Sequence, residues 1–147
     1  MSTRLSAKFT LWCNRFLAAV LTGLCLVLPS LLKWYVSLRP LVPSSQRAIL
    51  AGFYCCVPVV AYALWCIDRL VANILAESVF VLPNVRYLRR IRWCCAGVSL
   101  ICLIPAVFYP PLVFMVVIMA FLALIVSVVK NVMAAAVEIR EENDLTV

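Results

Sequence analysis

The sequence predicts an all-α integral membrane protein that folds as a four-helix transmembrane bundle, and two observations support this fold class. Hydrophobic residues make up 67% of the 147-residue chain and charged residues only 13%, which is about half the charged share of an ordinary soluble domain. A soluble domain of this size leaves too much surface in water to hide so many apolar side chains. The apolar residues also form continuous runs, which favour helices over the alternating pattern of a β-barrel.

Each predicted span comes from an uncharged run, because a membrane helix needs about 20 mainly apolar residues. Two runs lie between Arg15 and Lys33 and between Arg47 and Asp68. A longer run over residues 93–129 has room for two helices, and Tyr109-Pro110-Pro111 predicts a turn inside it. We therefore expect one membrane domain over residues 1–147, with a tail over 132–147. Its spans are expected at about residues 12–32, 48–67, 93–109 and 112–131.

The distribution of basic residues predicts the orientation in the membrane. Of the 13 Lys and Arg residues, Lys33, Arg39 and Arg47 fall on one side of the predicted spans and the other ten on the opposite side, which holds both termini. Basic residues are enriched in cytoplasmic segments. We therefore expect both termini in the cytoplasm, and we attribute the net charge of +7 to orientation, with no direct binding of nucleic acid.

Helices two and four are expected to extend into the cytoplasm. After Asp68, which we expect to pair with the adjacent Arg69, apolar residues continue at helical spacing. Asn84 is expected to cap the next helix. That helix begins with an arginine cluster, whose members are Arg86, Arg89, Arg90 and Arg92. The cluster has two interpretations, which the sequence leaves open: an orientation signal beside helix three, or a binding surface for anionic lipid headgroups or an acidic protein.

Helix four carries two further candidate surfaces. Its acidic tail comprises Glu138, Glu141, Glu142 and Asp144 and is a candidate surface for a partner. Its small face comprises Ala120, Ala123, Ser127, Asn131 and Ala134, which step by three or four residues along one side of the helix. Small residues allow membrane helices to approach closely. The small face predicts either packing inside the bundle or a homodimer contact.

Neither catalysis nor a bound cofactor is predicted. The chain has no histidine, which removes imidazole-based acid–base chemistry and histidine–metal sites. Its eight cysteines include no C-x-x-C pair, so redox catalysis and a zinc site are both disfavoured. A soft-metal site at Cys66, Cys94 and Cys95 is a weaker alternative. We therefore expect no catalytic residues, no metal ligands and no cofactor.

Two segments resemble a known family. They are Asn84-Val85-Arg86-Tyr87-Leu88-Arg89-Arg90-Ile91 before an apolar helix, and the ending Glu141-Glu142-Asn143-Asp144-Leu145-Thr146-Val147. With four spans in a chain of this length, they resemble domain-of-unknown-function family 2975, small four-span membrane proteins of mainly Gram-positive bacteria. The resemblance implies a multi-pass protein of the bacterial cytoplasmic membrane. It also implies a partner, since such proteins are often encoded beside a small helix-turn-helix regulator.

The sequence thus favours a non-enzymatic membrane interaction protein that tethers or modulates a soluble DNA-binding regulator. Two alternatives stay open. An immunity-type protein would bind a membrane-active peptide through the outer segment over residues 34–47. A small transporter or pore would need a polar path, yet the centres of the four predicted spans contain no ionisable residue.

Overall fold

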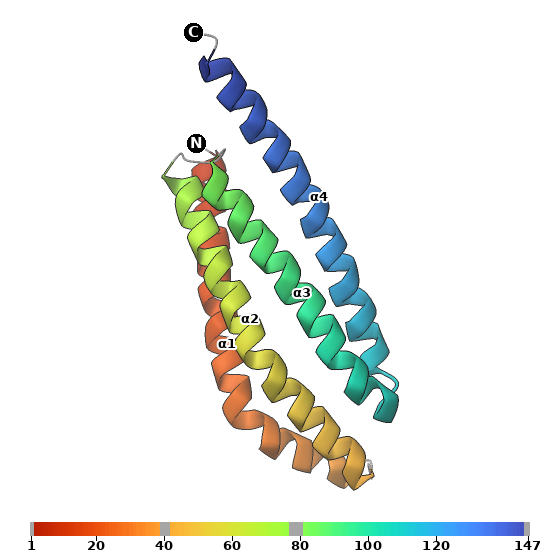
Figure 1. The fold of residues 1–147 in the computed structure, drawn as a ribbon. Helices are drawn as coiled ribbons and strands as arrows, with labels where there is room; N and C mark the ends of the chain where they lie inside the picture. Colours follow the sequence, from red (N-terminus) through yellow and green to blue (C-terminus); the bar gives the residue numbers. More distant parts are fainter. Residues whose placement is uncertain (1, 39–41, 77–80, 146–147) are drawn as a thin grey trace.

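Figure 1 shows the computed structural model of the protein, which describes residues 2–38, 42–76 and 81–145. These residues form four helices and contain no strand: α1 (Ser2–Leu38), α2 (Pro43–Leu75), α3 (Leu82–Phe108) and α4 (Leu112–Leu145). Each helix is long and apolar enough to cross a membrane, as expected of a multi-pass membrane protein. The prediction of an all-α fold with four spans is confirmed.

Prolines lie at the boundaries of the last three helices. Pro43 begins α2, Pro83 lies in the first turn of α3, and Pro110-Pro111 separate α3 from α4. Proline is tolerated in a first turn because the N–H that it lacks would have no partner within the helix. Asn84 is not the cap of α3, contrary to expectation. The helix already begins at Leu82, so Asn84 lies inside its first turn.

The helices are longer than the apolar runs that they contain. The arginine cluster and the third apolar run belong to one continuous helix, α3. At 1.5 Å per residue, the 34 residues of α4 measure about 51 Å, whereas the hydrocarbon core of a bilayer is about 30 Å thick. A large part of α4 therefore extends beyond the length needed to cross a membrane.

The helices pack in chain order. Backbone contacts join α1 to α2, α2 to α3 and α3 to α4, and among the described helices α1 has none with α3 or α4. The Tyr35 hydroxyl of α1 does lie 3.3 Å from that of Tyr109, in the turn between α3 and α4. Figure 1 shows the same order, with α3 between α2 and α4. The bundle is therefore open, and each outer helix, α1 and α4, has one helical neighbour in the described part of the chain.

Pro29 explains a bend in α1. Figure 1 shows that α1 changes direction along its length, and Pro29 lies inside this helix. Because proline lacks an N–H, the carbonyl four residues earlier, on Cys25, loses its helical donor. The hydroxyl of Tyr54 on α2 donates to the Cys25 carbonyl at 2.9 Å. The bend and the contact between α1 and α2 are thus linked by one hydrogen bond.

Side-chain donors to backbone carbonyls connect every pair of neighbouring helices. In apolar surroundings such donors have no water to bind, so they bind the adjacent helix. Besides Tyr54, three side chains make such bonds: Asn14 Nδ2 to Leu64 O at 2.9 Å, Ser45 Oγ to Phe108 O at 3.2 Å, and Ser99 Oγ to Val116 O at 3.0 Å.

Gly52 allows the closest approach between α2 and α3. A Cβ atom added at Gly52 would lie 2.9 Å from Cγ of Pro105 on α3, and 3.6 and 3.7 Å from the other two ring carbons nearest to it. The proline ring is rigid and Pro105 is buried, so the ring cannot rotate away as a flexible side chain would. Only glycine fits at this position without separating the helices.

We predict that Gly52→Ala lowers the free energy of unfolding by about 1–3 kcal/mol, as overpacking does in a close-packed core. Gly23→Ala is the matched control, because an added Cβ at Gly23 meets nothing within 4 Å, and it should lose no stability. Unfolding of both variants in mixed micelles measures the difference. Equal stability of Gly52→Ala and wild type would contradict the close approach.

We also predict that Tyr54→Phe costs about 1 kcal/mol of unfolding free energy, because a polar contact inside a membrane protein is typically worth this much. The cost should fall towards zero in a Pro29→Ala background, since an alanine at this position would supply the N–H that the Cys25 carbonyl lacks. The four proteins of this double-mutant cycle are compared by the same unfolding assay. Additive effects would show that Tyr54 does not compensate for Pro29.

Candidate functional site

One end of the molecule gathers most of the charged segments. The beginning of α1, the end of α2 and the beginning of α3 lie together in Figure 1, and the C-terminal part of α4 projects past them. The arginine cluster and the acidic tail are both found at this end. We refer to it as the charged end.

Aromatic rings accompany the arginines at the charged end. The guanidinium of Arg90 lies 5.8 Å from the ring centre of Tyr87, and that of Arg69 lies 5.7 Å from the ring of Trp65. Trp65 and Tyr87 meet edge to face at 6.2 Å, so the four side chains form one contact across α2 and α3. Such pairs of arginine and aromatic rings suit a membrane interface, where the ring lies in apolar surroundings and the cation reaches water.

The arginine cluster divides into two parts. Arg86, Arg89 and Arg90 are exposed, and they can meet an anionic headgroup or an acidic protein. Arg92 is half-buried and its Nη1 donates to Ser127 Oγ on α4 at 3.4 Å. The structure therefore joins the arginine cluster to the small face through one hydrogen bond. The sequence predicts these two surfaces independently of each other.

The small face is only partly turned towards α3. Ala123, Ser127 and Ala134 are half-buried, whereas Ala120 and Asn131 are exposed. α4 also meets α3 through its backbone at Val116, whose carbonyl accepts the hydrogen bond from Ser99. On the same helix Val137, which is 4% exposed, is buried.

The acidic tail belongs to the helix itself. Glu138, Glu141 and Glu142 lie on the C-terminal turns of α4 and are exposed. Asp144 belongs to the same helix by its backbone, and its side chain lies outside the described part of the structure. The carboxylates of this tail offer hydrogen-bond acceptors to a basic partner.

A hydrogen bond between the buried Asn84 and the half-buried Asn73 fixes the start of the arginine-bearing helix. Asn84 is 0% exposed, and its Oδ1 accepts a hydrogen bond from Asn73 Nδ2 on α2 at 2.8 Å. Burial of an amide is favourable only when it is hydrogen-bonded. Asn84 thus ties the end of α2 to the start of α3 and sets the position of the arginine cluster.

Asp68 pairs with a residue that the sequence did not suggest. We expected Arg69, but the structure places Arg15 Nε of α1 3.6 Å from Asp68 Oδ1. Adjacent residues on a helix point in different directions, and Arg69 instead lies over Trp65. The sequence did contain one indication of this pair. Arg15 and Asp68 each border an uncharged run, so both are expected at the same depth in the membrane.

Two cysteines whose thiols lie close together come from different helices and are not neighbours in the sequence. Sγ of Cys56 on α2 lies 3.9 Å from Sγ of Cys102 on α3, and the thiols remain free. Cys66 and Cys94 are buried. Across the described ranges, no group of three or more Cys, Asp or Glu side chains could hold a metal ion.

Comparison with known proteins identifies the family. Residues 16–147 match the family model described as "Protein of unknown function (DUF2975)". No significant match is found among curated proteins or among solved structures. The family model covers most of the chain, including all of α2, α3 and α4 and most of α1. The chain therefore belongs to the DUF2975 family.

Proposed function

We propose that the protein is a non-enzymatic membrane interaction protein that holds a soluble, basic regulator at the cytoplasmic face of the bacterial membrane. The observation that carries this proposal is the acidic tail, which continues α4 as a helix past the rest of the charged end. A helix that projects from its bundle presents its side chains to a soluble protein without hindrance from the membrane.

The acidic side chains of the tail share one face of the helix. At about 100° per residue, Glu141 and Glu142 lie about 60° and 40° to either side of Glu138, so the three carboxylates form one face. Arg140 lies about 160° from Glu138 on the opposite side. A face with three exposed carboxylates attracts a basic surface, and opposite charges of this kind mainly set the rate and specificity of association.

The distribution of basic residues supports a cytoplasmic location for this tail. Ten of the 13 Lys and Arg residues would lie on the side of the two termini, and basic residues favour the cytoplasmic side. A helix-turn-helix regulator is the partner suggested by the family resemblance. Such proteins carry basic surfaces that bind phosphates, which would fit the acidic face of the tail better than the arginine cluster.

We predict that the protein, tagged at its N-terminus and purified in mild detergent from its own cell, captures a small basic helix-turn-helix protein. The triple variant Glu138→Gln/Glu141→Gln/Glu142→Gln should capture roughly tenfold less, because it removes three charges that contact the partner. Capture by wild type should also weaken as salt rises. Quantitative mass spectrometry of the captured proteins measures both effects.

Arg140→Gln is the matched control, since it alters a charge on the opposite side of the same helical turns and should leave capture unchanged. Two results would contradict the proposal. One is equal capture of the regulator by the triple variant and by wild type. The other is a set of captured proteins that contains no basic regulator.

A further inference from the structure

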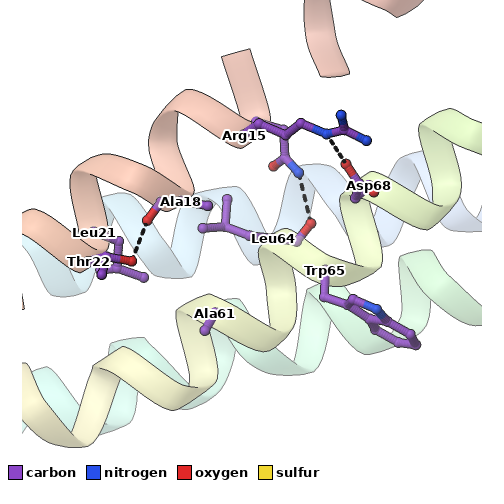
Figure 2. A pocket seen from close by; sticks show the side chains of 9 residues that line it. Arg15, Ala18, Leu21, Thr22, Ala61, Leu64, Trp65 and Asp68 are labelled. Atoms are coloured by element: carbon purple, nitrogen blue, oxygen red, sulfur yellow. Dashed lines mark hydrogen bonds and ion pairs between the residues drawn. The ribbon is translucent and has the colours of Figure 1, made fainter. Parts of the chain in front are cut away.

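A cavity lies between α1 and α2 near the charged end. Its volume is about 340 Å³, and Figure 2 shows the residues that line it. Most of the lining is apolar, from residues such as Ala18, Leu21 and Ala61, and the charged residues Arg15 and Asp68 belong to the same lining. None of the proposed contacts of the acidic tail involves this cavity.

Two polar groups of the cavity already have partners. Asn14, which is 6% exposed, uses its amide to donate to the Leu64 carbonyl at 2.9 Å. The Thr22 hydroxyl donates to the Ala18 carbonyl of its own helix at 2.9 Å (Figure 2). The charged groups open to a ligand are therefore Arg15 and Asp68.

The ion pair leaves both charges incompletely satisfied. The Arg15 Nε to Asp68 Oδ1 distance of 3.6 Å is too long for a hydrogen bond. Asp68 Oδ1 is buried and accepts no hydrogen bond from the described residues, although a buried carboxylate oxygen without a donor is costly. The Arg15 side chain is 74% exposed, and a guanidinium has five N–H donors. A ligand could therefore donate a hydrogen bond to the Asp68 carboxylate and accept hydrogen bonds from the Arg15 guanidinium.

The position of the ion pair along the helices matches the edge of a bilayer. Arg15 immediately precedes the uncharged run at residues 16–32, and Asp68 immediately follows the run at 48–67. Ala18, Leu21 and Ala61 lie inside these runs. Charged groups therefore lie at the level of lipid headgroups, while the apolar lining lies at the level of acyl chains. Lys8 and Trp12 line an adjoining hollow with Arg15 and add positive charge there.

We propose that this cavity binds a phospholipid with an ethanolamine headgroup. The phosphate accepts hydrogen bonds from the Arg15 guanidinium, the primary ammonium donates to the Asp68 carboxylate, whose side chain is 33% exposed, and an acyl chain lies along Ala18, Leu21 and Ala61. The headgroup carries one anion and one cation, which complement the two charges of the site. A choline headgroup has the same charges, but its trimethylammonium has no N–H to donate to Asp68.

The test compares the two lipids on the purified full chain. Wild-type protein in mild detergent receives an equimolar mixture of phosphatidylethanolamine and phosphatidylcholine with identical acyl chains, and native mass spectrometry measures the bound lipids. We expect the ethanolamine lipid to be retained preferentially. Asp68→Asn should reduce its retention roughly tenfold, because the ammonium loses its anionic acceptor. Retention of the choline lipid should fall less, since that lipid loses only a charge attraction and no hydrogen bond.

Arg47→Gln is the control for removal of a charge elsewhere on α2. Arg47 is an exposed cation on the first turns of α2, at the opposite end of that helix from Asp68, so its loss should not affect retention. Equal retention of the two lipids by wild type would overturn the proposal. So would a loss in Arg47→Gln as large as the loss in Asp68→Asn.

Two further measurements keep the proposal falsifiable if Asp68→Asn does not fold. Ala61→Leu keeps both charges and fills part of the apolar lining, so it should also reduce retention of the ethanolamine lipid, and unchanged retention would count against the cavity. Soluble phosphoethanolamine has the headgroup without the acyl chains and should not displace the lipid at equal concentration. Displacement at equal concentration would show that a free headgroup, and not a lipid, is the ligand.

Discussion

The arrangement of this protein depends on one constraint, which is that polar groups in apolar surroundings must find hydrogen-bond partners within the protein. Pro29 removes the donor for the Cys25 carbonyl, and Tyr54 of the neighbouring helix replaces it. Ser99 similarly donates to the Val116 carbonyl. Bonds of this type join each helix to the next along the chain, and the close contact of Gly52 with Pro105 reinforces the central pair.

An open row of helices has consequences for function. Because α1 packs on α2 alone among the described helices, the cavity between them can be reached by lipids from the membrane. Because α4 packs on α3 alone and exceeds the thickness of a bilayer, its acidic end can reach a soluble protein. The two proposals therefore concern opposite ends of the row: a lipid site between α1 and α2, and a docking surface on α4.

The four helices and the turn between α3 and α4 are encoded locally, in uncharged runs and in the adjacent prolines Pro110 and Pro111, so the sequence alone was sufficient to predict them. The pairing of Arg15 with Asp68 depends on how α1 and α2 are rotated against each other, which no local pattern specifies. The same holds for the small face of α4, where Ala123 is half-buried and Ala120 is exposed. The sequence around Asn84 is typical of a helix cap. Its actual partner, Asn73, lies on another helix, so this hydrogen bond depends on how α2 and α3 pack and not on local sequence.

Sidedness is the central claim that connects the acidic tail to a cytoplasmic partner. The most direct test introduces Glu141→Cys or Ser44→Cys into a chain whose eight native cysteines are replaced by alanine. A membrane-impermeant maleimide is then applied to intact protoplasts and to inverted vesicles. We predict that Glu141→Cys reacts only in inverted vesicles and Ser44→Cys only in protoplasts. Labelling of Glu141→Cys in intact protoplasts would contradict it.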